Sequence, residues 1–276
     1  MGRFTDKVVI VTGSSAGIGK AVILGFAKEG ASVVLHGTNT ERLANAEKAL
    51  HAAGIPGNRI LKIQGFINED AVQDRIINET VTRFGRLDVL VNNAGLYKKP
   101  GQANEIENFD HVFAVNVRAV FRLVELATPH LEKTKGNIIN VSSVLSFSKP
   151  IEIGSEFVAY SMTKAAQDRF TQNINQSLMK KGIRINNINP GPFVSNALNR
   201  ALGDDAPVQP ANSAVTFESG SIISFATAAK RFGDVEELVP AFLLLADEKS
   251  SFITGSIWAV DGGASTWAPE ATDLKL

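Results

Sequence analysis

The sequence of 276 residues predicts an α/β protein, in which a doubly wound parallel sheet of about seven strands carries helices on both faces. Short runs of β-branched residues, such as Val8–Val11, alternate along the chain with longer helix-forming segments. Such continuous apolar runs are typical of strands that are buried on both faces of a parallel sheet. No linker, repeat or charged block divides the chain, so we expect a single domain over residues 1–276.

Each element follows from its local pattern. The expected helices carry apolar stripes, for example Val72, Ile76 and Ile77 in 69–84, and a capping-box-like start at Asp234 begins the last one. Strands are expected at 8–11, 31–35, 59–64, 88–91, 137–141, 184–189 and 256–260, and helices at 20–29, 40–53, 69–84, 108–133 (one or two), 157–181 and 234–246. Right-handed crossovers then place the first and fourth strands at the topological switch point.

Composition excludes several classes of function. The 28 Lys and Arg balance 28 Asp and Glu, so nothing favours nucleic acid or an anionic membrane as a partner. The chain has no cysteine, which excludes disulfides and thiolate chemistry, and its four histidines lack metal-ligand spacing, so we expect no metal. No apolar stretch has the length of a membrane span and none precedes the first strand, so we expect a cytoplasmic protein.

A glycine-rich loop follows the first strand directly. Residues 12–19 carry Gly13, Gly17 and Gly19 in the spacing Gly-x3-Gly-x-Gly and lead into a helix. Glycines allow a tight turn and the close approach of a pyrophosphate, whose charge is favoured at a helix N-terminus. The arrangement predicts a Rossmann-type dinucleotide site, with the segment 92–95 after the fourth strand meeting the loop in the crevice.

The residues after the second strand bear on the choice of cofactor. Sites that prefer NAD place an acid there to hold the ribose 2′-hydroxyl. Here the segment 36–39 contains no carboxylate, and Thr38, Asn39 and Arg42 could contact a 2′-phosphate. We therefore expect NADP(H), with NAD(H) as the alternative; an ordinary polar turn would explain the same residues.

A tyrosine and a lysine four residues apart stand on an expected helix. Tyr160 and Lys164 would share one face, one turn apart. A neighbouring ammonium group favours the phenolate and lowers the tyrosine pKa from about 10, which gives a proton donor and acceptor that works near neutrality. Asn116 lies in an apolar context and would need partners, and pinning its helix to the 92–95 loop is its simplest role.

Together these motifs resemble the short-chain dehydrogenase/reductase family, in its single-domain branch. The matching positions fall in the family's order over essentially the whole chain: 12–19, 92–95, Asn116, Ser142 and Ser143, Tyr160 and Lys164, Pro190 and Gly191, 253–255 and 261–263. The resemblance implies an oxidoreductase that transfers a hydride between NADP(H) and a small carbonyl or alcohol substrate.

The resemblance also implies a role for each residue. Tyr160 would act as general acid and base, and Ser143 would hydrogen-bond the same substrate oxygen. Lys164 would lower the Tyr160 pKa and hold the nicotinamide ribose, and Asn116 would link Lys164 through water to solvent as a proton relay. The expected cofactor contacts are Gly13, Ser15, Gly17, Ile18, Gly19, Thr38, Asn39, Asn92, Ala94, Gly95, Tyr160, Lys164, Pro190, Gly191, Val194 and Ser195.

The chain departs from the family's pattern in three places. Phe66 stands where the family usually has an Asp that contacts adenine, so we expect Phe66 to pack there or Asn68 to substitute. No basic residue occupies the usual 2′-phosphate positions. The loop 144–156 is longer than usual, which makes Ser146 and Ser148 rivals of Ser143; we prefer Ser143 because it directly follows a strand.

Two further segments and the assembly are expected as follows. Residues 196–231 form the least regular stretch and are interpreted as a lid over the substrate pocket, or as a loop that only packs on the core. The tail 264–276 either covers a neighbour's pocket or is disordered. The resemblance implies a homo-oligomer, a dimer or tetramer, with helix faces at 108–133 and 157–181 as interfaces.

Two other functions compete with hydride transfer to a carbonyl. One is a non-catalytic dinucleotide-binding sensor or scaffold on the same fold, since fold alone does not guarantee activity. Such a protein would be expected to have lost Ser143, Tyr160 or Lys164, and this chain keeps all three. The other is related chemistry, an epimerase or an enoyl reductase; the enoyl type spaces its tyrosine and lysine further apart.

Overall fold

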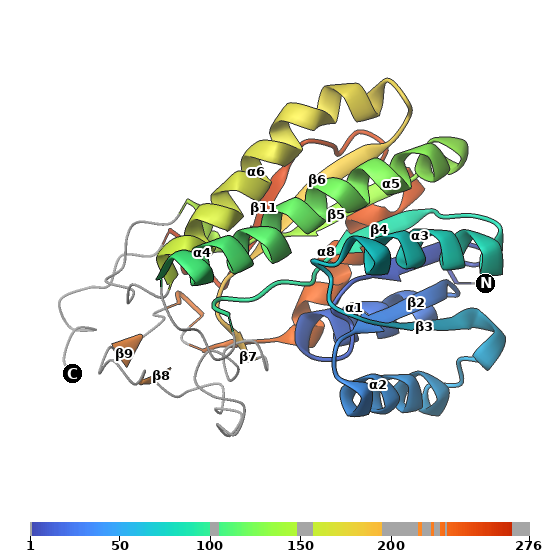
Figure 1. Cartoon of the computed structure of the whole chain (residues 1–276), viewed down its shortest axis with the longest axis horizontal. Helices are drawn as coiled ribbons and strands as arrows, with labels where there is room; N and C mark the ends of the chain where they lie inside the picture. The colour runs from blue at the N-terminus through green and yellow to red at the C-terminus, as the bar shows by residue number, and fades with distance from the viewer. Residues whose placement is uncertain are drawn as a thin grey trace.

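The computed structural model of the chain describes residues 2–99, 105–147, 157–194, 215–216, 222–223, 227–229 and 231–266. At its centre lies a seven-stranded sheet in the order β11-β6-β5-β4-β1-β2-β3, with every neighbouring pair parallel (Figure 1). The strands are β1 (Val8–Val11), β2 (Ser32–Gly37), β3 (Ile60–Gln64), β4 (Val89–Asn92), β5 (Asn137–Val141), β6 (Arg184–Pro190) and β11 (Ile257–Val260). This confirms the predicted fold class, and β1 lies between β2 and β4 at the switch point as expected.

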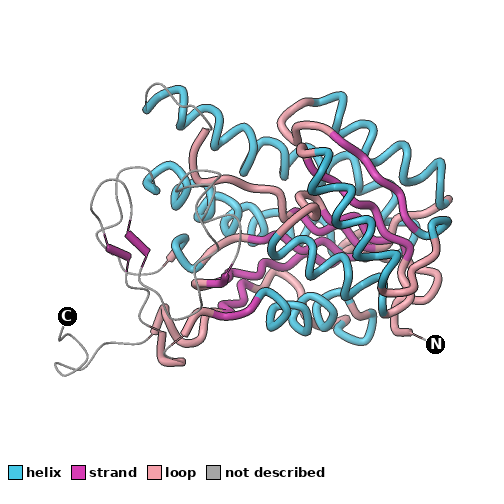
Figure 2. The backbone as a smooth tube through the Cα atoms, turned by 90° about the horizontal axis from the view of Figure 1, so that it is seen from below, coloured by secondary structure: helices cyan, strands magenta, loops and turns pink. Residues whose placement is uncertain are grey.

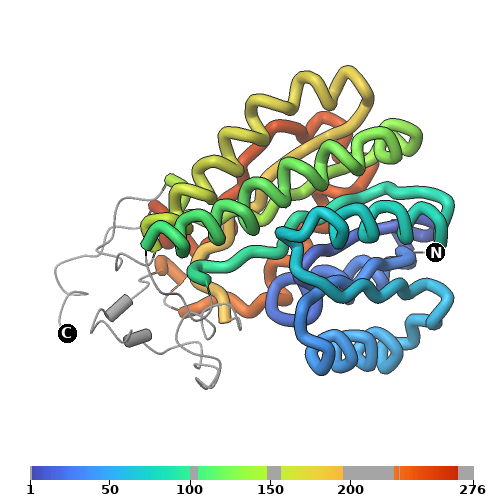
Figure 3. Tube along the Cα trace, viewed as in Figure 1, coloured from blue at the N-terminus to red at the C-terminus, as the bar shows by residue number. Residues whose placement is uncertain are grey.

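Helices cover both faces of the sheet (Figures 1 and 2). One face carries α1 (Gly17–Lys28), α2 (Thr40–Ala52) and α8 (Val239–Ala246), and the other carries α3 (Asp70–Phe84), α4 (Glu105–Phe113), α5 (Ala119–Thr134) and α6 (Val158–Met179). The expected helix at 108–133 is two helices joined by a π-helical turn, η2 (Ala114–Arg118). Figure 3 traces α4, η2 and α5 as one continuous rod beside α6.

The two faces bury two separate apolar cores because side chains alternate along a strand. Val9 and Val11 point into the core under α1, α2 and α8, whereas Ile10 between them points into the core under α3, α5 and α6. Ile10 also pairs in register with Val34 on β2 and Leu90 on β4, and both belong to the same core as Ile10. Burial on both faces explains why these strands read as unbroken apolar runs.

Short elements complete the described chain. These are η1 (Gly57–Arg59), η3 (Val144–Ser146), η5 (Val235–Leu238) and η6 (Glu248–Ser250), with the strand pairs β7 (Phe193–Val194)–β10 (Gly233–Asp234) and β8 (Val215–Thr216)–β9 (Ile222–Ile223). The expected capping box is present, because Asp234 and Glu237 bond each other's backbone at the start of η5. Most of the expected lid at 196–231, the tail beyond Thr266 and the loop 148–156 lie outside the described residues.

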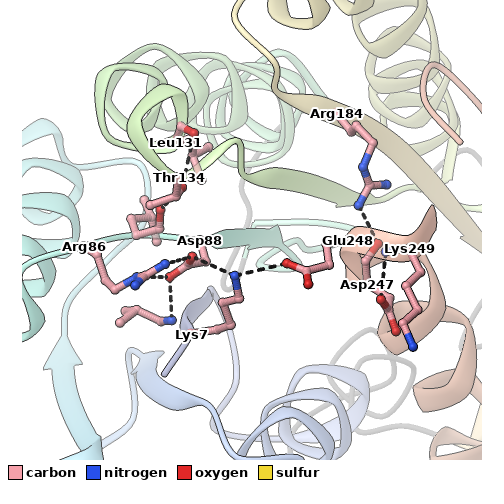
Figure 4. A network of polar contacts seen from close by, with 11 residues as sticks. Lys7, Arg86, Asp88, Leu131, Thr134, Arg184, Asp247, Glu248 and Lys249 are labelled. Carbon is pink, nitrogen blue, oxygen red and sulfur yellow. Dashed lines mark hydrogen bonds and ion pairs between the residues drawn. The ribbon is translucent and has the colours of Figure 1, made fainter. Parts of the chain in front are cut away.

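A polar network closes the amino ends of the strands (Figure 4). The buried Asp88 carboxylate accepts hydrogen bonds from Val8 N at 2.9 Å and from the Arg86 guanidinium at 2.7 and 2.8 Å. Lys7 lies 3.9 Å from Asp88 and 3.4 Å from Glu248, which joins β1 to η6. The carboxyl ends of the strands, at the opposite edge, are left for the candidate site.

Candidate active site

Tyr160 and Lys164 lie one turn apart on α6, and both are buried. Tyr160 is 8% exposed and Lys164 is 3% exposed. The Lys164 Nζ donates a hydrogen bond of 2.6 Å to the carbonyl oxygen of Val141, the last residue of β5, and lies 5.4 Å from the centroid of the Tyr160 ring. Helix α6 therefore presents both side chains to the carboxyl end of the sheet, as their spacing predicts.

Ser143 meets Tyr160 from the end of β5. Its side-chain oxygen caps η3 by accepting from Leu145 N at 3.2 Å, and its hydroxyl lies near enough to that of Tyr160 to lower the Tyr160 pKa. Its carbonyl oxygen accepts from Asn189 Nδ2 on β6 at 3.0 Å. Ser143 is thus held by the end of β5, which it follows, and by Asn189 near the end of β6. These two strand ends fix its hydroxyl beside the Tyr160 phenol.

The rival serines do not share this position. The Ser146 hydroxyl donates to Asp168 Oδ2 at 2.5 Å and accepts from Asn189 Nδ2 at 3.0 Å, so its hydrogen-bonding capacity is used inside the protein. Ser148 lies outside the described residues. Among the described serines of the loop, the structure brings Ser143 to Tyr160.

Asn116 is fully buried and anchors the chain just after β4. Its amide nitrogen donates to Leu96 O and to Thr163 Oγ1, both at 3.0 Å, and its amide oxygen accepts from Leu96 N at 3.1 Å. The expected pinning role thus appears at Leu96, one residue beyond the 92–95 segment. Asn116 lies in the π-helical turn η2, and such turns are frequent at functional sites.

A residue that sequence reasoning missed stands between Asn116 and Lys164. Gln167 Nε2 donates to Asn116 O at 2.5 Å, and Gln167 Oε1 accepts from Lys164 Nζ at 3.2 Å. Gln167 thus joins Lys164 to the main chain of Asn116 by direct hydrogen bonds, and the expected proton relay through water stays a prediction. Gln167 could have been identified from its position three residues after Lys164, because residues three apart on a helix share a face.

Burial sets the protonation of the pair. It raises the pKa of Tyr160 well above its ordinary value, and the nearby Tyr97 raises it further, while the Ser143 hydrogen bond opposes the shift. Burial also lowers the pKa of Lys164 from 10.5 to about 7, against the charge of Asp168. The expectation that Lys164 lowers the Tyr160 pKa is wrong here, because desolvation outweighs a lysine that is itself only partly charged at neutral pH.

Tyr97 is the second residue that sequence reasoning missed. Its ring centroid lies 4.3 Å from that of Tyr160 and 5.3 Å from that of Phe157, and its presence raises the pKa of Tyr160. It follows Gly95 by two residues in the loop after β4, so its place beyond a strand at the switch point was the signal that could have identified it.

The glycine-rich loop packs tightly against the segment after β4. Gly13 has a φ of 65°, and a Cβ there would lie 2.9 Å from Ala94 Cα. A Cβ on Gly19 would lie 2.4 Å from Asn93 Nδ2, which itself donates to the Gly13 carbonyl oxygen at 3.2 Å. The structure therefore brings the two expected cofactor segments together, and only glycine fits at both positions.

The edge beside this loop suits an anionic dinucleotide. Ala16 precedes α1 without a side-chain cap, and the first turn of α1 has no acidic residue. The buried Oδ1 of Asn92, at the end of β4, has no hydrogen-bond partner within the described part of the chain. An uncapped helix N-terminus and an unsatisfied acceptor beside it are features that a pyrophosphate and a ribose would satisfy.

The end of β2 is organised by His36. The His36 Nδ1 accepts from Gly13 N at 3.1 Å, so Nε2 carries the proton and donates to Gly65 O at 3.1 Å. Burial lowers the His36 pKa to about 4, which agrees with a neutral ring. Thr38 and Asn39 are exposed, and Asn39 Oδ1 caps α2 by accepting from Arg42 N at 2.8 Å.

The other expected cofactor residues line the same edge. Ser15 Oγ lies 2.5 Å from the position of a Cβ on Gly37, and Gly191 N donates to Val260 O at 3.0 Å just after β6. Ile18 packs partly buried against the core, Pro190 ends β6 and Val194 ends β7, whereas Ser195 lies outside the described residues. Phe66, which we expect to pack at the adenine position unless Asn68 substitutes there, is 57% exposed.

Two kinds of site find no support in the described residues. They contain no group of three or more histidine, aspartate or glutamate side chains placed to hold a metal ion. No helix within the described ranges combines the length and apolar character that a membrane crossing requires.

The comparison with known proteins agrees with this geometry. A family model described as short chain dehydrogenase matches residues 7–206. The chain belongs to the short-chain dehydrogenase/reductase family. This short-chain dehydrogenase is 31% identical over 264 residues to the 3-oxoacyl-(acyl-carrier-protein) reductase of Thermotoga maritima, covering 95% of this chain and 98% of that protein.

Two further relatives have different names. The L-fucose dehydrogenase of Bos taurus is 33% identical to this short-chain dehydrogenase over 265 residues, covering 95% of this chain and 90% of that protein. A crystal structure of a Caenorhabditis elegans short-chain dehydrogenase/reductase of unknown function, solved with cofactor, has a TM-score of 0.84 and 32% identity. That match covers 96% of this chain and 97% of the other chain.

Proposed function

We propose that this short-chain dehydrogenase moves a hydride between NADP(H) and a carbonyl or alcohol substrate, with Tyr160 as general acid and base. The observation that carries the proposal is the meeting of Ser143 and Tyr160 hydroxyls beside Lys164, at the sheet edge where the glycine-rich loop opens. When bound, the reduced nicotinamide supplies the hydride to the substrate carbon. The described residues supply the proton and stabilise the charge on the oxygen.

The side chains divide this work. Tyr160 is a protonated phenol at neutral pH, because burial raises its pKa, so it donates a proton to the substrate oxygen in reduction. The Ser143 hydroxyl donates to the same oxygen as negative charge develops there. The Lys164 ammonium group, 5.4 Å from the centroid of the Tyr160 ring, offsets part of the desolvation cost of the phenolate that remains while Lys164 is protonated.

The test is a screen of carbonyl and alcohol substrates with both cofactors. The purified protein should turn over at least one carbonyl with NADPH, and Tyr160→Phe should lower kcat by about 10²-fold or more. A Gln176→Ala variant, which changes an exposed polar residue on the same helix, serves as the matched control. Dinucleotide binding without any Tyr160-dependent turnover would favour the alternative, a sensor or scaffold.

The preference for NADP(H) over NAD(H) rests on the end of β2. Thr38 and Asn39 are exposed there, and the first carboxylate after the strand is Glu41, in the first turn of α2. Thr38→Asp would place an acid beside a 2′-phosphate and should shift the ratio of kcat/KM values toward NADH. A wild-type protein that prefers NADH strongly would overturn this part of the proposal.

Assembly and location complete the proposal. Exposed apolar side chains on the two expected interface helices, Phe121 on α5 and Met162 on α6, favour a homo-oligomer in which these faces meet. Light scattering on the purified protein, with Phe121→Lys as the variant, tests this assembly. The cytoplasmic location and the single domain over 1–276 stay predictions.

A further inference from the structure

His36, a histidine that is 2% exposed, joins the end of β2 to two neighbouring segments. Its main chain exchanges two hydrogen bonds with Ser14, because Ser14 N donates to His36 O at 2.8 Å and His36 N donates to Ser14 Oγ at 3.0 Å. Its ring makes two more, because Nδ1 accepts from Gly13 N at 3.1 Å and Nε2 donates to Gly65 O at 3.1 Å. One residue thus holds the turn after β1 and the segment after β3 together.

The ring of His36 works through hydrogen bonds and not only by filling space. Gly13 N is a main-chain donor and Gly65 O is a main-chain acceptor, so the neutral ring with its proton on Nε2 serves both. Burial lowers the His36 pKa to about 4, so the ring keeps this form at neutral pH. An apolar side chain of similar size would leave both main-chain groups without these partners, and the two segments would shift to find others.

Both segments turn at a glycine, which has no side chain to hold its own backbone. Gly13 has a φ of 65°, and a Cβ there would lie 2.9 Å from Ala94 Cα. Gly65 has a φ of 156°, and a Cβ there would lie 2.5 Å from Val72 Cγ2. The hold on these two turns therefore comes from a neighbouring strand, through His36.

Both turns lie at the candidate cofactor edge and away from the proton-transfer residues. The Gly13 turn leads to the uncapped N-terminus of α1, which suits a pyrophosphate, and Gly65 directly precedes Phe66, which we expect at the adenine position. Tyr160 and Ser143 lie beside the end of β5, which β4 and β1 separate from β2, so they are about 14 Å away across the sheet. A disturbance at the end of β2 should therefore reach the adenosine and pyrophosphate before it reaches the transferred proton.

We propose that His36 is a positioning residue for the dinucleotide, which holds the Gly13 turn and Gly65 at the spacing that its pyrophosphate and adenosine require. This inference rests on the proposed function, in which the site takes a nicotinamide dinucleotide. His36 is buried beneath the two turns and acts through Gly13 N and Gly65 O. Loss of its ring bonds should weaken the binding of the dinucleotide and leave the chemical step nearly unchanged.

The decisive variant is His36→Leu, which has a similar volume and makes neither ring bond. Isothermal titration calorimetry should show that its Kd for NADPH, or for NADH if that binds more tightly, is raised by about tenfold or more. The matching fragment without nicotinamide, 2′-phospho-ADP-ribose or ADP-ribose, should lose the same factor in affinity. The kcat at saturating cofactor should change by less than about twofold, because only binding is affected.

Two further variants serve as controls. His36→Gln is the rescue, because its amide can accept from Gly13 N and donate to Gly65 O, and its Kd should stay within about threefold of the wild-type value. His51→Leu makes the same substitution where the ring also bonds a main-chain carbonyl, that of Ile55 at 3.1 Å, but at the far end of α2. Its Kd should equal that of the wild type.

A folded His36→Leu protein with the wild-type Kd would overturn the inference, because a purely structural role lowers stability alone. If His36→Leu does not fold, His36→Asn decides, since its Oδ1 can accept from Gly13 N but its short amide does not reach Gly65 O. Its Kd should rise by at least about threefold, and an unchanged Kd would overturn the inference. A protein that binds the dinucleotide through His36 without any Tyr160-dependent turnover would refute the proposed function alone, so the two failures are distinguishable.

Discussion

Asn189 on β6 donates a hydrogen bond of 2.9 Å to the carboxylate of Asp168 on α6. Asp168 is buried, and it also accepts from Asn187 Nδ2 at 2.7 Å and from Ser146 Oγ at 2.5 Å. Since Asn189 donates to the Ser143 carbonyl oxygen as well, the carboxylate anchors the loop that presents Ser143 to Tyr160.

Asp168→Asn should therefore damage both stability and activity. The amide leaves buried donors without acceptors, which should lower the free energy of unfolding by about 2–4 kcal/mol. The kcat should fall as well, because the Ser143 loop loses its anchor and the pKa of Lys164 falls below about 7 without the Asp168 charge. Urea denaturation and steady-state kinetics measure the two effects.

The control for Asp168 is Asp74→Asn, which removes the partly exposed partner of Arg122. That change should cost less than about 1 kcal/mol. Equal costs for the two variants would show that the buried carboxylate is not the anchor.

Ser143→Ala and Ser146→Ala should have very different effects on turnover. Ser143 is the hydroxyl that meets Tyr160, so its loss should lower kcat by about 10²–10³-fold, as removal of an oxyanion donor does. Ser146 is engaged with Asp168, so its loss should mainly cost about 1 kcal/mol of stability. The reverse order of kcat values would identify Ser146 as the polarising group.

His36 should make stability depend on pH. Its pKa is about 4 in the folded protein and about 6.5 when unfolded, so the unfolded chain binds the proton first as pH falls. The stabilisation from the neutral ring is complete above pH 6.5 and should fall by about 3 kcal/mol toward pH 4.

The comparison for His36 is the His36→Gln variant, whose amide can accept from Gly13 N and donate to Gly65 O but does not titrate. Denaturant unfolding of both proteins between pH 4 and 8 gives the difference curve. Parallel curves for the two proteins over this window would contradict the assignment.

Arg184 should support stability without touching the chemistry. Its buried guanidinium donates to Asp247 O at 3.0 Å (Figure 4). It also donates to Leu245 O at 2.8 Å and to Ile253 O at 3.1 Å, so it satisfies carbonyl groups at and beyond the end of α8. Arg184→Lys keeps the charge but loses the forked geometry, and should lower the free energy of unfolding by about 2–3 kcal/mol.

The kcat of Arg184→Lys, measured at a temperature where the variant is folded, should equal that of the wild type. Arg184 begins β6 and the site lies at its other end, about 20 Å away along an extended strand. Arg75→Lys, in an exposed pair with Glu79, is the control and should be nearly neutral. A large loss of kcat in Arg184→Lys would show that the two ends of the sheet are coupled.

The fold was predictable because its signals are local. Unbroken apolar strands, a glycine-rich turn and helical spacing fixed the order of elements, and the parallel sheet then brought residues 13–19 and 93–94 together. The same logic placed Tyr160 and Lys164 on one buried face.

The remaining parts of the site depend on partners far apart in sequence. The Gln167 side chain donates a hydrogen bond to the carbonyl oxygen of Asn116, which lies 51 residues earlier. The ring of Tyr97, in the loop after β4, packs against the ring of Tyr160 on α6. The pKa of Tyr160 was predicted in the wrong direction because spacing reports a neighbouring charge but not the depth of burial. Neither the contacts between distant residues nor the depth at which a side chain is buried can be read from one segment of the chain.

The separation of the polar network around Asp88 and Arg184 from the hydroxyls at the opposite edge has a practical consequence. A library of random substitutions could be sorted once for expression and once for turnover. The variants that lose expression and those that lose turnover should then carry their substitutions at opposite ends of the strands. Substitutions at the amino ends would lower the yield of soluble protein, but the molecules that fold would have normal activity. Substitutions at the carboxyl ends would leave the yield unchanged and give inactive protein. Directed evolution of substrate range could therefore proceed at one edge while stabilising substitutions are collected independently at the other.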